Sequence, residues 1–189
     1  MIFTSSSTFI FIHLVILLAF LITPIQSILS HTSLLEQICR QSPNYHVCII
    51  TLRSSIHHKS KEDMAGFARL TLEIVNVNAS TTLEHIHKYY RQTTNHKVKK
   101  ALKYCLGSYN TILYVYLRKA LNAIEKRDYK IAKQGTYVII LEIESCNNKF
   151  RNLVISPIRD TNPYIQNLCS ITISIVDNLI QSHQPTLTY

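Results

Sequence analysis

The chain has 189 residues, of which 47% are hydrophobic and 16% charged, so it can fill a packed core and is not a disordered tail. Its 20 Lys and Arg residues outnumber 11 Asp and Glu residues, which gives a net charge of +9. It has only three glycines, well below the usual ~7%. This scarcity argues against glycine-rich phosphate loops and dinucleotide-binding turns and favours one mostly helical domain.

The N-terminus carries an apolar segment of 14 residues over positions 9–22, interrupted only by His13. A membrane-spanning helix needs ~20 apolar residues, so the segment is too short for one. We interpret residues 1–27 as a secretory signal peptide cleaved near Ser27, followed by a linker over 28–33. No Lys or Arg precedes the apolar segment, and the alternatives are a retained membrane anchor or a segment packed into the fold.

The chain contains five cysteines, which in an exported protein are first interpreted as disulfide partners. No Cys or His pairs have the spacing of a zinc site. His57 and His58, and likewise His85 and His87, lie one and two residues apart, which points them to different faces of a helix. We expect no metal ion and no cofactor.

Two short helical segments are expected at residues 34–40 and 45–52, separated by the helix-breaking cluster 41–44. In one unbroken helix, nine residues would separate Cys39 from Cys48 by ~13.5 Å. A disulfide needs its Cα atoms within ~7 Å. A Cys39–Cys48 bridge therefore requires the chain to reverse between the two segments.

Four blocks with helical periodicity follow from residue 63 onward. Helix breakers separate them at residues 93–95, at 127–128 and in a loop over 152–163. The expected apolar stripes are, block by block, Phe67, Leu70, Ile74, Val77, Leu83, Ile86 and Tyr90; Val98, Leu102, Cys105, Tyr109, Ile112, Tyr116, Ala120 and Ala123; Ala132, Thr136, Ile139, Ile143, Cys146 and Phe150; and Ile165, Leu168, Thr172, Ile175 and Leu179.

These elements predict an all-α fold, an antiparallel up-down four-helix bundle preceded by an N-terminal helical hairpin. Cys105 and Cys146 lie almost equally far from the turn at 127–128, so folding the second and third helices together brings them level. We expect a Cys105–Cys146 disulfide that contributes ~2–4 kcal/mol. Cys169 is left over and is interpreted as a buried free thiol, with an intermolecular disulfide as the alternative.

Catalytic residues are not evident in the sequence. Glu142 and Glu144 are two residues apart and diverge on a helix, so they do not form a general acid–base pair. There is no Gly-x-Ser-x-Gly nucleophile turn and no phosphate-binding loop. We therefore expect that the protein is not an enzyme.

A cluster of lysines, Lys97, Lys99, Lys100 and Lys103, opens the second helical block. We interpret it as a solvated face, with weak electrostatic association with an acidic polysaccharide as the alternative. Export argues against a nucleic-acid partner. Asn78 begins the single N-glycosylation sequon, which lies inside the first helical block and therefore need not be used.

Five short motifs occur in order along residues 34–183. They are Ile38-Cys39-Arg40-Gln41-Ser42-Pro43-Asn44-Tyr45 with Cys48, Ala101-Leu102-Lys103-Tyr104-Cys105 with Tyr109, Arg127-Asp128-Tyr129 with Ala132, Ser145-Cys146 with Phe150, and Val154-Ile155-Ser156-Pro157. Together they resemble the plant invertase and pectin methylesterase inhibitors, closest to pollen-allergen-type members described as invertase inhibitors. The inhibitor-like domain would span 34–183 and leave a tail over 184–189.

The resemblance implies a helical bundle behind a hairpin, with one disulfide in the hairpin and one between the second and third long helices. It also implies a stoichiometric inhibitor that lays helices over the substrate cleft of a carbohydrate-active enzyme. Asp128 and Tyr129 with Ala132 resemble the pectin methylesterase side of the family. We therefore expect pectin methylesterase as the target and Asp128, Tyr129 and Lys130 as target-binding residues, with acid invertase as the alternative target.

The resemblance also implies a location. Such inhibitors are secreted to the apoplast and cell wall, or to the vacuole when the target is vacuolar invertase. No membrane contact is expected after signal cleavage, and the acidic polysaccharide considered above would be that of the cell wall.

Two departures from the family keep other functions open. Residues 137–141 are bulky where the family usually has Ser-Ala-Ala-Leu, which would change how closely the helices approach. The Pro-Lys-Phe motif of invertase inhibitors is replaced by residues 129–131, in which only Lys130 carries over. A diverged interaction module without inhibitory activity is one alternative. A small-ligand carrier, with a cavity lined by tyrosines including Tyr109, Tyr114 and Tyr116, is another.

Overall fold

The structure is a computed structural model and describes residues 11–17, 34–56, 63–153 and 156–182. Within these ranges the chain forms helices and turns and no strand. The expected linker and tail lie outside the described residues, and so does all of the expected signal peptide except residues 11–17, which are helical and exposed. No described helix is both long and apolar enough to cross a membrane.

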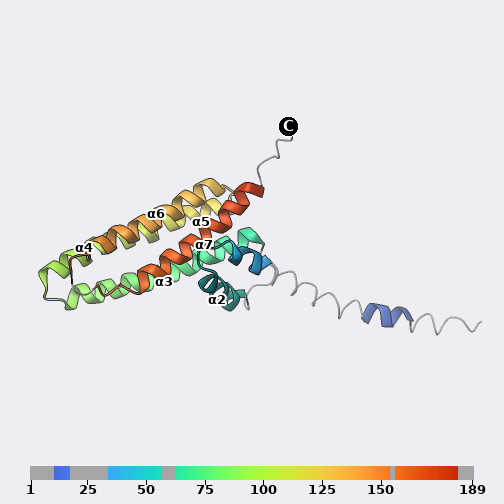
Figure 1. Cartoon of the computed structure of the whole chain (residues 1–189), viewed down its shortest axis with the longest axis horizontal. Helices are drawn as coiled ribbons and strands as arrows, with labels where there is room; N and C mark the ends of the chain where they lie inside the picture. The colour runs from blue at the N-terminus through green and yellow to red at the C-terminus, as the bar shows by residue number, and fades with distance from the viewer. Residues whose placement is uncertain (1–10, 18–33, 57–62, 154–155, 183–189) are drawn as a thin grey trace, which may run out of the picture.

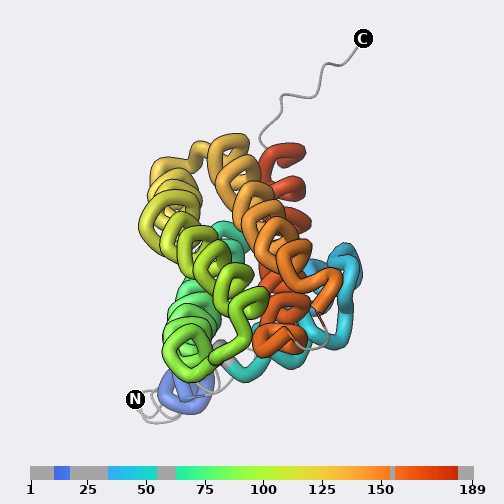
Figure 2. The backbone as a smooth tube through the Cα atoms, turned by 90° about the vertical axis from the view of Figure 1, so that its left-hand side faces the viewer, coloured from blue at the N-terminus to red at the C-terminus, as the bar shows by residue number. Residues whose placement is uncertain are grey.

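Four long rods form the body of the molecule (Figure 1). They are α3 (Met64–Gln92); a second rod made of α4 (His96–Thr111), η1 (Ile112–Tyr116) and α5 (Leu117–Glu125); α6 (Tyr129–Asn148); and α7 (Thr161–Ser182). Consecutive rods run in opposite directions, each packs against the next, and α7 packs against α3 to close the bundle (Figure 2). This is the antiparallel arrangement that short connections favour.

A helical hairpin precedes the bundle. Residues 34–40 are helical and α2 (Tyr45–Ile56) follows, four residues longer than expected. A disulfide joins Cys39 to Cys48 with their Cα atoms 5.4 Å apart. The hairpin is fixed to the bundle where Ser174 Oγ of α7 donates a hydrogen bond of 2.9 Å to the carbonyl oxygen of Gln41.

The connections between the rods lie where the breaker residues predict them. Thr93, Thr94 and Asn95 link α3 to α4, and Asn95 caps α4 because its side-chain oxygen accepts from the backbone N–H groups of Lys97 and Val98, at 3.0 and 3.2 Å. The last link is shorter than expected. It ends before Thr161, since Pro163 sits in the first turn of α7, where its missing N–H needs no partner.

The expected apolar stripe of α3 was correct at Phe67 and Ile86 but wrong at Val77. Val77 is 64% exposed, and two threonines, Thr71 and Thr82, are buried among the apolar residues. The Thr82 hydroxyl donates to the carbonyl oxygen of Asn78 at 2.7 Å, so its burial leaves no polar group unpaired. At the centre of the bundle, Thr172 Oγ1 of α7 donates to Thr71 Oγ1 at 2.7 Å.

The second rod contains a π-helical turn, η1, that the periodicity did not reveal. A π-turn holds one more residue than an α-turn, so the buried face shifts within it. Leu117 is therefore 1% exposed and occupies the core, whereas the expected core residue Tyr116 is only partly buried.

Gly135 marks the closest approach between α5 and α6. A Cβ atom there would lie 3.3 Å from both Ala120 Cβ and the Tyr116 carbonyl oxygen. Of the bulky residues that replace the family's small-residue run, Ile139 is fully buried in the core, whereas Tyr137 and Leu141 point outward and are 54% and 40% exposed. Close helix packing is thus retained by Gly135 and Ala120.

A second disulfide and a buried polar network tie three rods together. Cys105 of α4 is bonded to Cys146 of α6, with Cα atoms 4.9 Å apart. Beside it, the Tyr109 hydroxyl donates to Asn162 Oδ1, and Asn162 Nδ2 donates to Asn147 Oδ1. Burial raises the pKa of Tyr109 well above its usual value, which keeps the phenol protonated as a donor.

Cys169 is a fully buried free cysteine on α7. Burial raises the pKa of its thiol to about 12, so thiolate is scarce at neutral pH. We expect a disulfide-reactive dye at pH 8 to label less than about 0.1 equivalent in the folded protein and about one equivalent in denaturant. Rapid labelling of the folded protein, or a covalent dimer on a non-reducing gel, would instead support intermolecular pairing.

Candidate functional site

The turn between α5 and α6 is built by a Schellman motif that has an unusual residue at its left-handed position. The N–H of Asp128 donates to the carbonyl oxygen of Ala123 at 2.8 Å, and the N–H of Arg127 to that of Ile124 at 3.0 Å. Arg127 has φ of 59°, a conformation in which glycine avoids the strain of a Cβ atom. Asp128 then caps α6, since its side chain accepts from the backbone N–H of Ile131 at 3.2 Å.

Arg127→Gly should therefore stabilise the protein. Glycine relieves the backbone strain at φ of 59°, and we expect the free energy of unfolding to rise by up to about 1 kcal/mol in a denaturant titration. Lys126→Gly is the control, since it replaces the adjacent residue, whose φ is −83°. If Lys126→Gly stabilised the protein and Arg127→Gly did not, this explanation would be contradicted.

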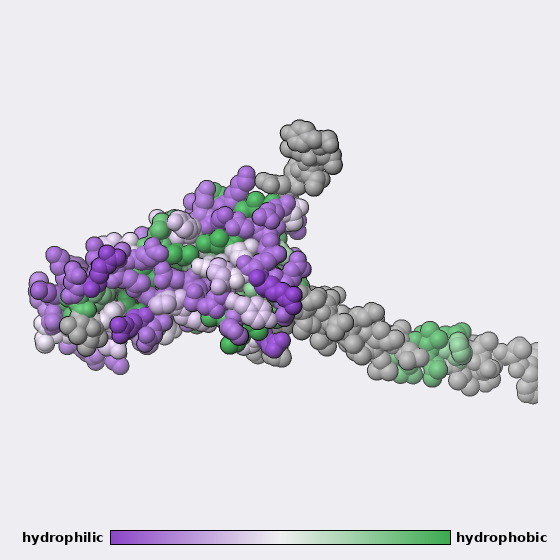
Figure 3. Space-filling view, viewed as in Figure 1, coloured by the Kyte–Doolittle hydropathy of each residue, from purple (hydrophilic) through white to green (hydrophobic). Residues whose placement is uncertain are grey.

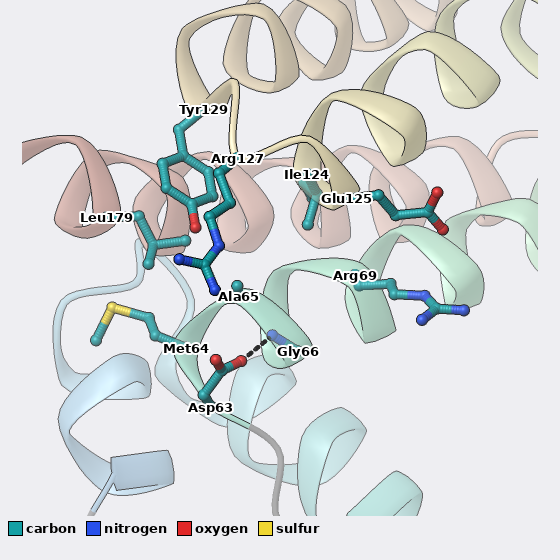
Figure 4. Close-up of a pocket in the computed structure, with 10 residues that line it drawn as sticks. All are labelled: Asp63, Met64, Ala65, Gly66, Arg69, Ile124, Glu125, Arg127, Tyr129 and Leu179. Atoms are coloured by element: carbon teal, nitrogen blue, oxygen red, sulfur yellow. Dashed lines mark hydrogen bonds between the residues drawn. The ribbon is translucent and has the colours of Figure 1, made fainter. Parts of the chain in front are cut away.

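A pocket of about 440 Å³ lies under this turn, between it, the start of α3 and the end of α7 (Figure 4). Figure 4 shows Arg127 extending from the turn toward the first turn of α3, with the ring of Tyr129 beside it and Leu179 opposite. Asp63 caps α3 on the far side, where its carboxylate accepts from the N–H of Gly66 at 2.7 Å. The pocket is thus part of the packing between three rods.

The three residues expected to bind a target have different surroundings. Tyr129 is only 7% exposed and is a core residue of the turn. Asp128 is exposed, but its carboxylate caps α6. Lys130 is exposed and lines an open groove, so it is the one of the three whose side chain is free to meet a partner.

That groove runs between α6 and α7 and continues to the hairpin. Near the turn its lining includes Lys130, Tyr137 and Ile180, and an ion pair crosses it where Lys133 Nζ lies 2.7 Å from Asp177 Oδ1. Farther along it is lined by Gln41, Pro43, Lys133, Tyr137, Ile140, Ser170, Ile173, Ser174, Asp177, Asn178 and Gln181, with a volume of about 740 Å³. Figure 3 shows the apolar strip that follows α6 and α7 on this face.

Tyr137 and Ile140 in this groove were not expected as surface residues. Their run of bulky residues suggested altered helix packing, and its outward direction was overlooked. The signal was available, because Tyr137 and Leu141 fall outside the stripe of Ala132, Thr136, Ile139 and Ile143. A large apolar residue off the core stripe points to solvent or to a partner.

The surroundings of these side chains suit binding to a partner. Within the described ranges no group of three or more His, Cys, Asp or Glu side chains could hold a metal ion. The tyrosines expected to line a ligand cavity diverge, since Tyr109 is fully buried and Tyr114 is 64% exposed. Asn78 is half-buried on α3, where its side-chain amide donates to the carbonyl oxygen of Ile74 at 2.8 Å, and its glycosylation stays a prediction.

The fold and this surface define a disulfide-linked helical bundle with an open groove between α6 and α7. Residues 33–175 match the family model described as plant invertase/pectin methylesterase inhibitor. The chain belongs to this family. Because the members are named as inhibitors of enzymes, membership agrees with the expectation that the protein is not itself an enzyme.

The relatives include one named as an inhibitor of fructosidase and one named as a pectinesterase inhibitor. The chain is 27% identical over 146 residues to "Cell wall / vacuolar inhibitor of fructosidase 1" of Arabidopsis thaliana, covering 77% of this chain and 69% of the relative. It is 23% identical over 180 residues to "Pectinesterase inhibitor" of Actinidia deliciosa, covering 94% of this chain and 96% of that protein.

Solved structures share the fold. A mutant form of a pectin methylesterase inhibitor from Arabidopsis superposes with a TM-score of 0.67 at 18% identity, covering 74% of this chain and 93% of that one. A second pectin methylesterase inhibitor, from Arabidopsis thaliana, gives 0.60 at 19% identity, covering 78% and 96%. The helical bundle expected from the sequence is therefore confirmed as the family's fold.

Proposed function

We propose that the protein is a secreted inhibitor of pectin methylesterase that covers the enzyme's substrate cleft non-covalently, one inhibitor to one enzyme. The observation that carries this proposal is the open α6–α7 groove, which presents Lys130 and Tyr137 beside apolar side chains on a rigid bundle. An exposed tyrosine on a rigid helix can bury surface at low entropic cost, and a neighbouring lysine can pair with an acidic group of the partner. The match along nearly the whole pectinesterase inhibitor of Actinidia deliciosa supports the choice of target.

Acid invertase is the second candidate target. It is favoured by the 27% identity to an inhibitor named for the cell wall, the vacuole and fructosidase. Either target agrees with export to the cell wall, and an invertase target also agrees with the vacuole. The two disulfides suit such an oxidising compartment.

Titration of the purified protein against a panel of plant pectin methylesterases and acid invertases tests both candidates. We expect pectin methylesterase activity to fall to zero near one equivalent of inhibitor, with invertase unaffected. Loss of invertase activity alone would reverse the assignment. Loss of neither would remove the inhibitor proposal and favour the diverged interaction module.

Substitution in the groove should weaken inhibition without unfolding the protein. We expect Lys130→Ala and Tyr137→Ala each to raise the inhibition constant by about 10-fold or more, since exposed residues at an interface centre carry much of the binding free energy. Lys126→Ala and Tyr114→Ala are the matched controls, because both residues are exposed but lie outside the groove. Equal effects of controls and groove variants would exclude the groove as the contact surface.

A further inference from the structure

The end of the bundle opposite the α5–α6 turn is strongly basic. Neither residues 85–124 nor residues 145–159 contain an Asp or a Glu. Residues 85–124 include the end of α3 and most of the second rod. Residues 145–159 run from the last turn of α6 into the loop before α7. The basic tip consists of Lys88 and Arg91 on α3, Lys97, Lys99, Lys100 and Lys103 on α4, and Lys149 just after α6.

Contacts between aromatic and basic side chains bring the three segments of the tip together. Lys99 Nζ of α4 lies 5.2 Å from the ring centre of Tyr90 on α3. Lys149 Nζ lies 4.2 Å from the ring centre of Tyr104 on α4. These cation–π contacts hold two lysines in place without neutralising their charge.

The charge of the tip is not compensated within the protein. Among the described residues, the ion pairs join Arg40 to Glu36, Arg69 to Glu73 and Lys133 to Asp177, and none involves a cation of the tip. All the tip cations except the partly buried Lys99 are exposed. Figure 3 shows the strongly hydrophilic surface at the α3–α4 end.

We propose that the basic tip binds a polyanion, and that its partner is a linear acidic polysaccharide whose sugars carry free carboxylates. Lysines predominate in the tip, and their flexible stems let each ammonium group reach carboxylates spaced along a polymer without requiring one fixed geometry. The two disulfides suit an oxidising compartment, where a polysaccharide is a more available polyanion than nucleic acid.

An anionic membrane fits the tip less well. The exposed large hydrophobic residues of the tip are two tyrosines, Tyr89 and Tyr104, each 43% exposed. A surface that enters the lipid boundary needs an apolar face to bury beside its charges. The described part of the tip has no such face.

The tip and the groove can act at the same time. Ile140 of the groove lies nine residues along α6 from Lys149 of the tip, about 13.5 Å at ~1.5 Å per residue, and Lys130 lies farther away still. Both separations exceed the Debye length of about 8 Å at physiological salt, so the charge of the tip has only a weak effect on binding in the groove. The inference therefore goes beyond the proposed inhibition and does not depend on which enzyme is inhibited.

Binding of the full chain to polygalacturonate, compared with fully methyl-esterified pectin, tests the inference. We expect polygalacturonate to bind at least about tenfold more tightly, and its affinity to fall about tenfold or more between 50 and 200 mM salt, because several charges are neutralised together. Equal binding to the two polymers, or affinity that does not respond to salt, would overturn the inference. So would tighter binding to phosphatidylserine vesicles at equal charge concentration.

Two triple variants distinguish the effect of charge located at the tip from the effect of the protein's net charge. Lys97→Gln, Lys100→Gln and Lys103→Gln together should weaken polygalacturonate binding about tenfold or more and flatten its salt dependence. Arg118→Gln, Lys119→Gln and Lys126→Gln remove the same charge from exposed positions on α5 and its cap, and should weaken binding less than about threefold. Equal losses would overturn the assignment to the tip. Enzyme inhibition is scored separately, so failure of the polyanion site and failure of the inhibitor proposal are distinguishable.

Discussion

Replacing both Cys105 and Cys146 with alanine should lower the free energy of unfolding by about 4 kcal/mol. The bond closes a loop with a sequence separation of 41 residues, and the entropy that it removes from the unfolded chain grows with loop length. A loss of this size is a large fraction of the ~5–15 kcal/mol that stabilises a typical domain. Denaturant titration followed by circular dichroism measures it.

The hairpin disulfide provides a matched control. Replacing Cys39 and Cys48 with alanine also removes two fully buried sulfurs, but it opens a loop with a separation of only nine residues. The expected loss is about 2.5 kcal/mol. A larger loss in the hairpin than in the bundle would mean that loop length does not set the contribution of the bonds.

Asn162→Ala should lower the free energy of unfolding by about 3 kcal/mol, the second large effect. Asn162 is fully buried at the start of α7, where it accepts from Tyr109 and donates to Asn147. Truncation leaves both partners without this hydrogen bond, and the Tyr109 hydroxyl is then unpaired at a fully buried position. An unpaired buried group costs more than the bond itself contributes.

A control variant and a double-mutant comparison test whether Asn162 acts through this hydrogen-bond network. Asn167→Ala removes a half-buried amide from α7 and should cost less than about 1 kcal/mol. Tyr109→Phe should cost about 1–2 kcal/mol in the native background and less when Asn162 is already alanine. Additive losses from Tyr109→Phe and Asn162→Ala would show that the two side chains do not act as one network.

Much of the fold could be predicted because its boundaries are encoded locally. Asn95 and Asp128 are polar N-caps that start α4 and α6, and each acts within a few residues of itself. The stripes of α6 and α7 were also correct, since the apolar residues there repeat regularly and the rods are buried along one face. The sequence therefore predicts the helical rods and most of the links between them.

The prediction failed where burial depends on contacts between distant segments. Thr71 enters the core because its hydroxyl accepts from Thr172, 101 residues away, and because it can also donate to a carbonyl of its own helix. The spacing of three and four residues from Phe67 leads to Leu70, Ile74 and Val77 and passes over Thr71. For the candidate site, local resemblance selected Tyr129, whereas its burial depends on α3 and α7.

The π-turn of the second rod has an evolutionary consequence. An insertion of one residue into a long helix would rotate everything beyond it by about 100° and expose half the core. Five residues, Ile112–Tyr116, take up such a surplus and return the chain to its former phase, leaving Tyr114 and Val115 side by side in solvent. We expect that deleting one of these two would let the helix become regular without disturbing Cys105 on one side or Ala120 on the other, so this turn should tolerate a one-residue difference in length between relatives.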